Sequence, residues 1–281
     1  MARKTLRKVA RKVARKVPRR TAQSSSLRAA RGSEAQLKGP RKRVAADKKA
    51  AAGAMPQWTP AEIAEAFRRF QAAMPEPKGE LKHVNPFTLL VAVVLSAQAT
   101  DAGVNKATKP LFKVADTPKK MAVLGVADLQ ERIKTIGLFR MKAKNVIALS
   151  EQLIAEHGGE VPREREALEA LPGVGRKTAN VVLNIAFGEP TLAVDTHVFR
   201  VAHRLDLASG KTPHEVEVGL LKVIPKVYLH HAHHWLILHG RYVCQARKPR
   251  CDVCVVNDLC TSADKWFDAP PRAELQRKAS S

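Results

Sequence analysis

A short glycine-bearing turn between two helical patterns offers the first candidate for chemistry. Residues 171–179 read LPGVGRKTA, with Gly173 and Gly175 on either side of Val174. Glycine permits positive φ and leaves the backbone uncovered, so amide N–H groups at the start of the next helix can face outward. The positive end of the helix dipole lies behind them, which makes an anion site suited to a DNA phosphate. A plain turn between packed helices is the alternative, but the adjacent Arg176 and the basic chain favour phosphate.

Lys177 lies in the first turn of the helix that follows. The helix dipole and the neighbouring Arg176 disfavour its cationic form, and partial burial would disfavour that form further. A neutral amine can attack a sugar C1′ and form a covalent Schiff base. A solvated lysine that contacts phosphate is the competing interpretation, and the residue alone does not decide between the two.

A carboxylate stands before a second helical pattern, in residues 193–201, which read AVDTHVFRV. Aspartate is a preferred N-cap residue, so Asp195 is expected to cap this helix. A carboxylate held at a helix start can also face positive charge that develops on a sugar. The two roles are compatible, and Asp195 is the second candidate catalytic residue.

All four cysteines of the chain lie between Cys244 and Cys260, spaced Cys-x6-Cys-x2-Cys-x5-Cys. A secreted disulfide scaffold would scatter its cysteines, so this grouping predicts a metal site in a reducing compartment. Zinc and a 4Fe–4S cluster both suit four thiolates, and the spacing leaves both open. The loop between the first two ligands carries Arg247, Lys248 and Arg250, and we expect a cationic knuckle there. The predicted ligands are Cys244, Cys251, Cys254 and Cys260.

Five histidines precede the cysteines, between His230 and His239. Core and surface positions on one helix explain them without a second metal site. We assign them no role.

The elements that must position these residues are helices. From Trp58 onward, capping boxes and prolines at first helical positions start one helical pattern after another, without alternating strand patterns or Asn-Gly turns. The fold class is therefore all-α with short loops. The expected helices span 61–74, 86–98, 118–125, 141–157, 163–171, 176–187, 195–205, a segment opened by 212–215, and 230–243.

The charge of the chain points to a polyanionic partner. There are 49 Lys and Arg against 26 Asp and Glu, a net charge of +23. Nucleic acid fits this balance better than an anionic membrane surface. No run of 18 apolar residues exists and the N-terminus lacks an apolar signal core, so we expect neither a membrane span nor secretion.

Most of this charge lies in the N-terminal segment. Residues 1–50 hold 18 Lys and Arg and two acids, and 6–17 repeat Arg-Lys-Val-Ala almost without variation. Such a block cannot bury enough apolar surface to offset its ordering entropy, so 1–56 is predicted to be a disordered basic arm. Non-specific DNA contact and an Arg-rich transit peptide are two roles that it could have.

Together these pieces resemble the endonuclease III family of helix–hairpin–helix DNA glycosylases and abasic-site lyases. The carriers are residues 96–101, 171–184, 194–201 and 233–241, together with the cysteine spacing. The likeness covers about residues 58–264, and the basic arm departs from the compact members of the family.

The resemblance implies a two-lobed all-α helix–hairpin–helix fold, with DNA across the cleft and a 4Fe–4S cluster as the cofactor. Residues 57–78 and 190–266 would form the iron–sulfur cluster domain, and 79–189 the helical barrel with the helix–hairpin–helix. The arm, 1–56, and a flexible tail, 267–281, would lie outside these domains.

The resemblance also implies residue roles. Lys177 would be the Schiff-base nucleophile and Asp195 its acidic partner. Gln98 would fill the gap left by the flipped base, and Leu138 would wedge the stack; extruding a base costs on the order of a few kcal/mol. The expected DNA contacts are Gln98, Leu138, Gly173, Val174, Gly175, Arg176, Lys248 and Arg250.

A sister branch of the family removes adenine from mispairs. It resembles this chain in hairpin, aspartate and cluster, but has a small hydroxyl residue where Lys177 stands and a further C-terminal domain. This chain has the lysine and only about 20 residues after Cys260. That difference favours a bifunctional enzyme, a glycosylase that also cleaves the strand by β-elimination.

We therefore expect a base excision repair enzyme that removes oxidised pyrimidines from damaged double-stranded DNA. It is expected to be a monomer in a bacterial-type cytoplasm, associated with the nucleoid, with organellar targeting less favoured. A glycosylase for mismatched or alkylated bases is the alternative within the class. A non-catalytic architectural DNA binder is the alternative outside it, and such a protein would not need both Lys177 and Asp195.

Overall fold

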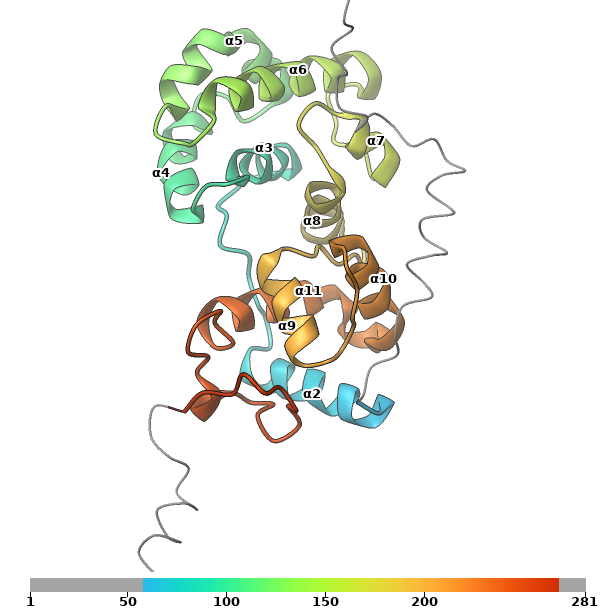
Figure 1. The fold of residues 1–281 in the computed structure, drawn as a ribbon. Coiled ribbons are helices and arrows are strands. Elements are labelled where there is room, and N and C mark those ends of the chain that lie inside the picture. The colour runs from blue at the N-terminus through green and yellow to red at the C-terminus, as the bar shows by residue number, and fades with distance from the viewer. Residues whose placement is uncertain (1–57, 268–281) are drawn as a thin grey trace, which may run out of the picture. The chain divides into compact units, whose positions relative to one another are not determined.

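The computed structural model describes residues 58–267, which fold into helices joined by short loops (Figure 1). Within this described part no β-strand forms, so the all-α prediction is confirmed. The predicted arm, and the predicted tail beyond residue 267, lie outside the described residues. The helices in chain order are α2 (Pro60–Ala73), α3 (Pro86–Ser96), α4 (Asp101–Leu111), α5 (Pro118–Ile133), α6 (Phe139–His157), α7 (Arg165–Ala170), α8 (Arg176–Phe187), α9 (Thr196–Arg204), α10 (Pro213–Val223), α11 (Lys226–Tyr242) and the short 3-10 helix η1 (Cys251–Val253).

Side-chain caps and prolines start several of these helices, as the sequence predicts. Thr59 accepts a hydrogen bond from the Glu62 amide, and the Glu62 carboxylate accepts one from the Thr59 amide. Asn85 and Thr88 form the same reciprocal pair at the start of α3. These pairs satisfy amide groups that a helix start leaves without partners, so each helix begins where its cap stands.

The first hydrophobic core forms around α3, in which every residue from Phe87 to Leu95 is buried. Because apolar side chains cover all sides of this helix, other helices must surround it, and α4, α6 and α8 pack against it. α5 packs in turn on α6, and α7 on α8. This core therefore fixes the turn that precedes α8, where Lys177 lies.

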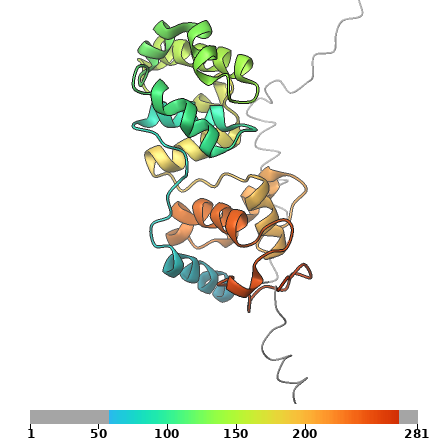
Figure 2. The same cartoon turned by 90° about the vertical axis from the view of Figure 1, so that its left-hand side faces the viewer.

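The second core joins α2 to α9, α10, α11 and the cysteine loop. α2 and α11 lie side by side in both views, although most of the chain separates them (Figures 1 and 2). Trp235 Nε1 donates to the Met74 carbonyl at 2.8 Å, and Phe67 packs near the indole. The chain thus leaves this core after α2 and returns to it after α8. The domain boundaries implied by the resemblance stay a prediction.

Two helical segments of the first core were not anticipated. Helix α4 is one, although Thr100 caps it by accepting from the Gly103 amide; Pro110 in its last turn weakens the pattern. The other is the part of α5 after Gly125. The first segment of α5 stops at Gly125, as expected, because Gly125 has a non-helical φ of 75°, and a second helical segment follows this kink.

Several helix boundaries also shift, among them the end of α3 and the start of α11. α3 ends at Ser96 instead of reaching Gln98, because Ala97 leaves the helical backbone with ψ 117° and Gln98 follows with a left-handed φ of 56°. α11 begins at Lys226 instead of His230, directly after Pro225. Proline has a fixed φ and cannot donate a backbone hydrogen bond, so it is well suited to precede a helix.

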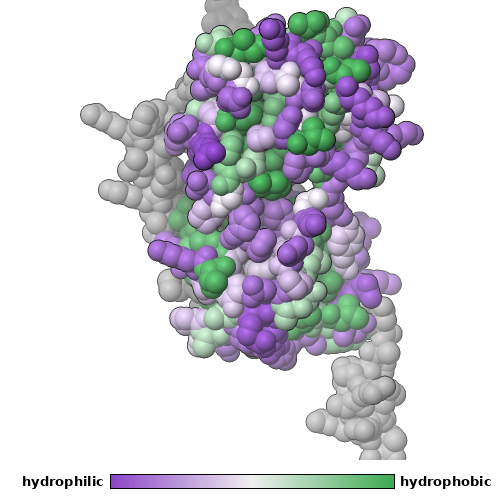
Figure 3. Space-filling view, turned by 180° about the vertical axis from the view of Figure 1, so that it is seen from behind, coloured by the Kyte–Doolittle hydropathy of each residue, from purple (hydrophilic) through white to green (hydrophobic). Residues whose placement is uncertain are grey.

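The outer surface mixes polar and apolar side chains. On the face seen in Figure 3, apolar residues are interspersed among hydrophilic ones. Among residues 58–267, no helix has the length and apolar character needed to cross a membrane.

Candidate active site and DNA interface

The turn before α8 has the geometry of an anion site. Gly173 has φ 79°, and a Cβ there would lie 2.8 Å from Asn145 Nδ2, so only glycine fits. Val174 is buried in the first core and anchors the turn. Gly175 is the N-cap of α8 without a side-chain cap, and a Cβ built on it would meet nothing within 4 Å. An anion can therefore approach the first amides of α8.

The Arg176 side chain has an ion-pair partner that the sequence did not indicate, and its contact with DNA stays a prediction. Its Nε and Nη2 donate to the two carboxylate oxygens of Glu217 at 2.9 and 3.0 Å, and the Glu217 side chain is 4% exposed. The bidentate pair ties the start of α8 to α10. The guanidinium thus holds the hairpin in place, and the expected DNA contact of Arg176 rests on its backbone amide.

Lys177 is exposed and lines a cavity of about 90 Å³. The lining of the cavity combines apolar side chains with charged and polar groups. The lining residues that matter here are the apolar Leu89, Val93, Val181 and Ile185 and the polar Ser96, Asp101, Lys177, His233 and Arg241.

His233 connects the two candidate catalytic residues. It is buried, and its Nδ1 donates to the Ala193 carbonyl at 2.9 Å. Burial, with a smaller effect from His234, lowers the pKa of His233 to about 4, while the Asp195 carboxylate raises this pKa and the Lys177 ammonium lowers it. His233 also lines the same cavity as Lys177 and bonds through Ala193 to the segment that leads to Asp195. No role was expected for His233 from the sequence, where its place in a segment that carried the resemblance was a signal.

Asp195 caps α9, as the sequence predicts. Its Oδ1 accepts from the amides of His197 and Val198, both at 2.8 Å. Both bonds end on one oxygen, so the cap does not use the second oxygen. The side chain is half-buried, and its catalytic role stays a prediction.

Gln98 and Leu138 stand at the tips of two neighbouring loops. Both have left-handed backbone, with φ 56° and 60°, and both are exposed. A left-handed conformation costs a non-glycine residue roughly 1 to 2 kcal/mol, so the surrounding structure must hold these tips. A Cβ on Gly137 would lie 3.7 Å from the Gln98 carbonyl oxygen, so the two loops are in contact. The structure brings together two residues that are separated by a helix-rich stretch of sequence.

The four cysteines are half-buried, and Cys244, Cys254 and Cys260 pack against the second core. Burial, with smaller effects from the sulfurs of Cys244, Cys260 and Cys251, raises the pKa of Cys254 to about 11. Within residues 58–267, no three His, Cys, Asp or Glu side chains converge on one metal-ion position. Iron–sulfur clusters are held by cysteine thiolates, commonly four, so the donor chemistry of these residues fits a 4Fe–4S cluster.

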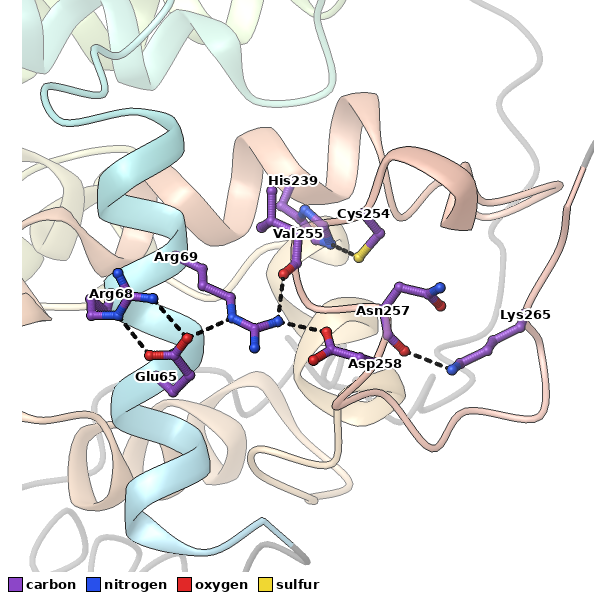
Figure 4. Close-up of polar contacts among 9 residues, drawn as sticks. All are labelled: Glu65, Arg68, Arg69, His239, Cys254, Val255, Asn257, Asp258 and Lys265. Carbon is purple, nitrogen blue, oxygen red and sulfur yellow. Dashed lines mark hydrogen bonds and ion pairs between the residues drawn. The ribbon is translucent and has the colours of Figure 1, made fainter. Parts of the chain in front are cut away.

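The cysteine loop is fastened to α2 and α11 (Figure 4). Arg69 on α2 donates to Asp258 at 2.6 Å and to the Val255 carbonyl at 3.1 Å. His239 Nε2 on α11 lies 3.7 Å from Cys254 Sγ. Two helices thus hold the loop that carries the ligands.

The cationic knuckle lies on the outside of this loop. Lys248 and Arg250 are exposed, as expected of DNA-contacting residues. Lys248 Nζ lies 5.1 Å from the centre of the Trp266 ring, a cation–π contact. Both residues are available at the surface, and their contact with DNA stays a prediction.

The chain is similar to known DNA repair proteins. The family described as HhH-GPD superfamily base excision DNA repair protein matches residues 91–226, and the iron-sulfur binding domain of endonuclease III matches residues 244–260. Endonuclease III of Haemophilus influenzae is 58% identical over 201 residues, which cover 72% of this chain and 95% of that protein. Endonuclease III of Escherichia coli is 57% identical over the same shares of the two chains.

Solved structures give the same result. A trapped endonuclease III–DNA covalent intermediate has a TM-score of 0.69 and 47% identity, and the match covers 73% of this chain and 97% of that one. A non-covalent endonuclease III–DNA complex has a TM-score of 0.69 and 47% identity, with 73% and 96% covered. A thermostable thymine-DNA glycosylase, at 24% identity and a TM-score of 0.61, shares the fold over 70% of this chain and 93% of its own.

Proposed function

The chain belongs to the endonuclease III family, and on this premise we propose that it removes oxidised pyrimidines from damaged duplex DNA. It is a base excision repair enzyme, a DNA glycosylase with abasic-site lyase activity. It binds a 4Fe–4S cluster. The lesion class and the roles of single residues are the proposed part.

One observation carries the catalytic assignment. Lys177 directly follows the hairpin and lines a cavity together with the buried His233, whose ring donates to the carbonyl of Ala193, two residues before Asp195. A phosphate held at the start of α8 would bring the backbone of the damaged strand beside the Lys177 amine. This supports Lys177 as the nucleophile and Asp195 as the carboxylate that stabilises positive charge on the sugar.

The reaction then follows from these two groups. The deprotonated Lys177 amine attacks C1′ while the C1′–N bond breaks, and the leaving base takes the electron pair and a proton. The C1′–O4′ bond of the resulting aminal then breaks, O4′ takes a proton, and the iminium that forms between Nζ and C1′ acidifies the C2′ hydrogens. Loss of a C2′ proton expels the 3′ phosphate by β-elimination, and water then frees the lysine.

The remaining residues hold the DNA. The hairpin amides of residues 173–176 and the knuckle residues Lys248 and Arg250 would bind phosphates. Gln98 would fill the gap left by the extruded base and Leu138 would wedge the neighbouring base pair. We infer a monomer that acts at the nucleoid, with residues 57–78 and 190–266 as the cluster domain and 79–189 as the helical barrel.

The cluster site lies apart from these steps. Cys244, Cys251, Cys254 and Cys260 would hold the iron. When bound, the cluster cross-links the loop and so keeps the knuckle in one shape. The contacts of Arg69 and His239 fasten the same loop to α2 and α11.

Borohydride trapping on iron-loaded protein tests the proposal. A duplex with one oxidised thymine should give a covalent complex with the native protein and none with Lys177→Ala. Lys119→Ala is the matched control, since Lys119 is also an exposed lysine in the first turn of a helix. Trapping of Lys177→Ala at native yield would assign the nucleophile elsewhere. Release of alkylated or mismatched bases without release of the oxidised thymine would mean that the protein acts on those bases and not on oxidised pyrimidines.

A further inference from the structure

A lysine is buried in the first core without being part of the proposed chemistry. Lys142, on α6, is 5% exposed, and burial lowers its pKa. Buried lysines are rare in proteins because the ammonium loses its hydration. Its Nζ donates to the Leu95 carbonyl at 2.9 Å.

The acceptor of this bond lies at the root of the Gln98 loop. Leu95 is in the last turn of α3, which ends at Ser96, and Gln98 follows in left-handed backbone. Carbonyls in a last turn have no partner within the helix and carry the negative end of its dipole. The Lys142 amine therefore caps α3 where the chain leaves it for the Gln98 loop.

The other end of Lys142 is bonded to the Leu138 loop. Its backbone amide donates to the Leu138 carbonyl at 3.1 Å, the first turn of α6. Gly137, one residue earlier, approaches the Gln98 carbonyl closely enough that a Cβ would lie 3.7 Å from it. The Lys142 side chain thus bonds to the root of the Gln98 loop, while its backbone lies in the helical turn that starts at Leu138, and the two loops touch at Gly137 and Gln98.

We propose that Lys142 is a positioning residue that locks the Gln98 and Leu138 loops into one rigid unit for insertion into the DNA helix. This inference rests on the filler and wedge roles of the proposed function. Both tips are exposed, and each is in a backbone conformation that a free loop would leave. When both loop tips are already ordered in the free protein, inserting them into DNA requires no further loss of their conformational entropy.

Lys142→Met tests the proposal, because methionine has a similar length and no donor. Under single-turnover conditions, release of an oxidised base from duplex should slow roughly tenfold to a hundredfold, as expected when loops that position a substrate lose their alignment. The fluorescence of a 2-aminopurine placed opposite the lesion, which reports its unstacking, should rise equally slowly. Borohydride trapping on a single strand with a preformed abasic site needs no insertion, and it should keep its native yield.

Further variants distinguish a positioning role of Lys142 from a general loss of stability or charge. Lys144→Met removes the same charge from an exposed site on α6, and its 2-aminopurine signal should match that of the native protein. Lys142→Arg keeps a donor and should restore much of the rate. In a Gln98→Ala/Leu138→Ala background, adding Lys142→Met should slow base release little further, because its effect acts through those two tips.

The outcomes are distinct for the two proposals. If the native protein releases no oxidised base, the proposed function fails. If the native protein is active and Lys142→Met inserts and excises at native rates, the positioning role is overturned. It is also overturned if Lys142→Met slows the reaction as much in the double-variant background as alone. If Lys142→Met loses its iron or unfolds, Lys142→Gln, which has a shorter donor, replaces it. Lys142→Gln should then slow base release and 2-aminopurine unstacking, by a smaller factor than expected for methionine. Native rates for Lys142→Gln would reject the positioning role.

Discussion

At the residue scale, one side chain can serve both the fold and the proposed chemistry. Asp195 is an N-cap through Oδ1, and its second oxygen is not needed for the cap. His233 is held neutral by burial, with its Nδ1 hydrogen on the Ala193 carbonyl. A neutral imidazole supplies no charge to the site, so the Asp195 carboxylate is the group proposed to stabilise positive charge on the sugar. The proposed chemistry therefore depends on the charge of Asp195 and not only on its cap.

Asp195→Asn separates these two uses. Asparagine is as good an N-cap as aspartate, so the melting temperature should change little. The missing charge should slow base release roughly a hundredfold to a thousandfold, as for the loss of one electrostatic stabiliser at a reacting centre. Cleavage of a preformed abasic site should fall less. Single-turnover kinetics on an oxidised duplex measure the rate of base release. An unchanged rate would mean that Asp195 acts only as a helix cap.

At the element scale, one ion pair holds the hairpin against a helix of the second core. Arg176 begins α8, and its guanidinium donates two hydrogen bonds to the nearly buried carboxylate of Glu217 on α10. The hairpin turn is fixed from the other side by Val174 and by the tight fit of Gly173 against Asn145. The direction in which the first amides of α8 point therefore depends on both cores.

Glu217→Gln tests this attachment. The amide can accept only one of the two donated bonds, and the guanidinium loses its counter-charge. We expect a loss of roughly 1 to 3 kcal/mol in the free energy of unfolding, measured by urea denaturation. Binding to undamaged duplex should weaken, because the phosphate site loses its fixed direction. Glu215→Gln on the same helix is the control, since Glu215 bonds only within its own helix start. Equal effects of the two changes would contradict a specific role of Glu217.

At the scale of the whole molecule, the charge is divided unevenly. Residues 1–50 hold 18 of the 49 Lys and Arg, whereas the proposed site residues all lie between Gln98 and Cys260. Phosphate contacts supply sequence-independent affinity, and the chemical step depends on groups at the lesion. Affinity for DNA and catalytic rate should therefore be separable by removing part of the chain.

A protein that starts at Gln57 should bind undamaged duplex more weakly. Each phosphate contact that is lost should reduce the log–log salt slope by roughly 0.9. Its single-turnover rate at saturating enzyme should match that of the full chain. A salt series of binding to undamaged duplex measures the slope. Identical slopes would mean that residues 1–56 do not touch DNA, and a lost rate would mean that they reach the active site.

The sequence by itself determined the features that depend on neighbours along the chain. Caps and prolines determined where α2 and α3 begin, and glycines determined the hairpin before Lys177, because each signal acts within one turn or loop. The cysteine spacing predicts the four ligands of a metal site. Three features were decided only by the tertiary structure: the Arg176–Glu217 pair, the burial of His233 at the cavity of Lys177, and the approach of the Gln98 and Leu138 loops beside the Lys142–Leu95 bond. Each joins residues far apart in sequence, and such contacts arise only when whole helices pack, which no local pattern encodes.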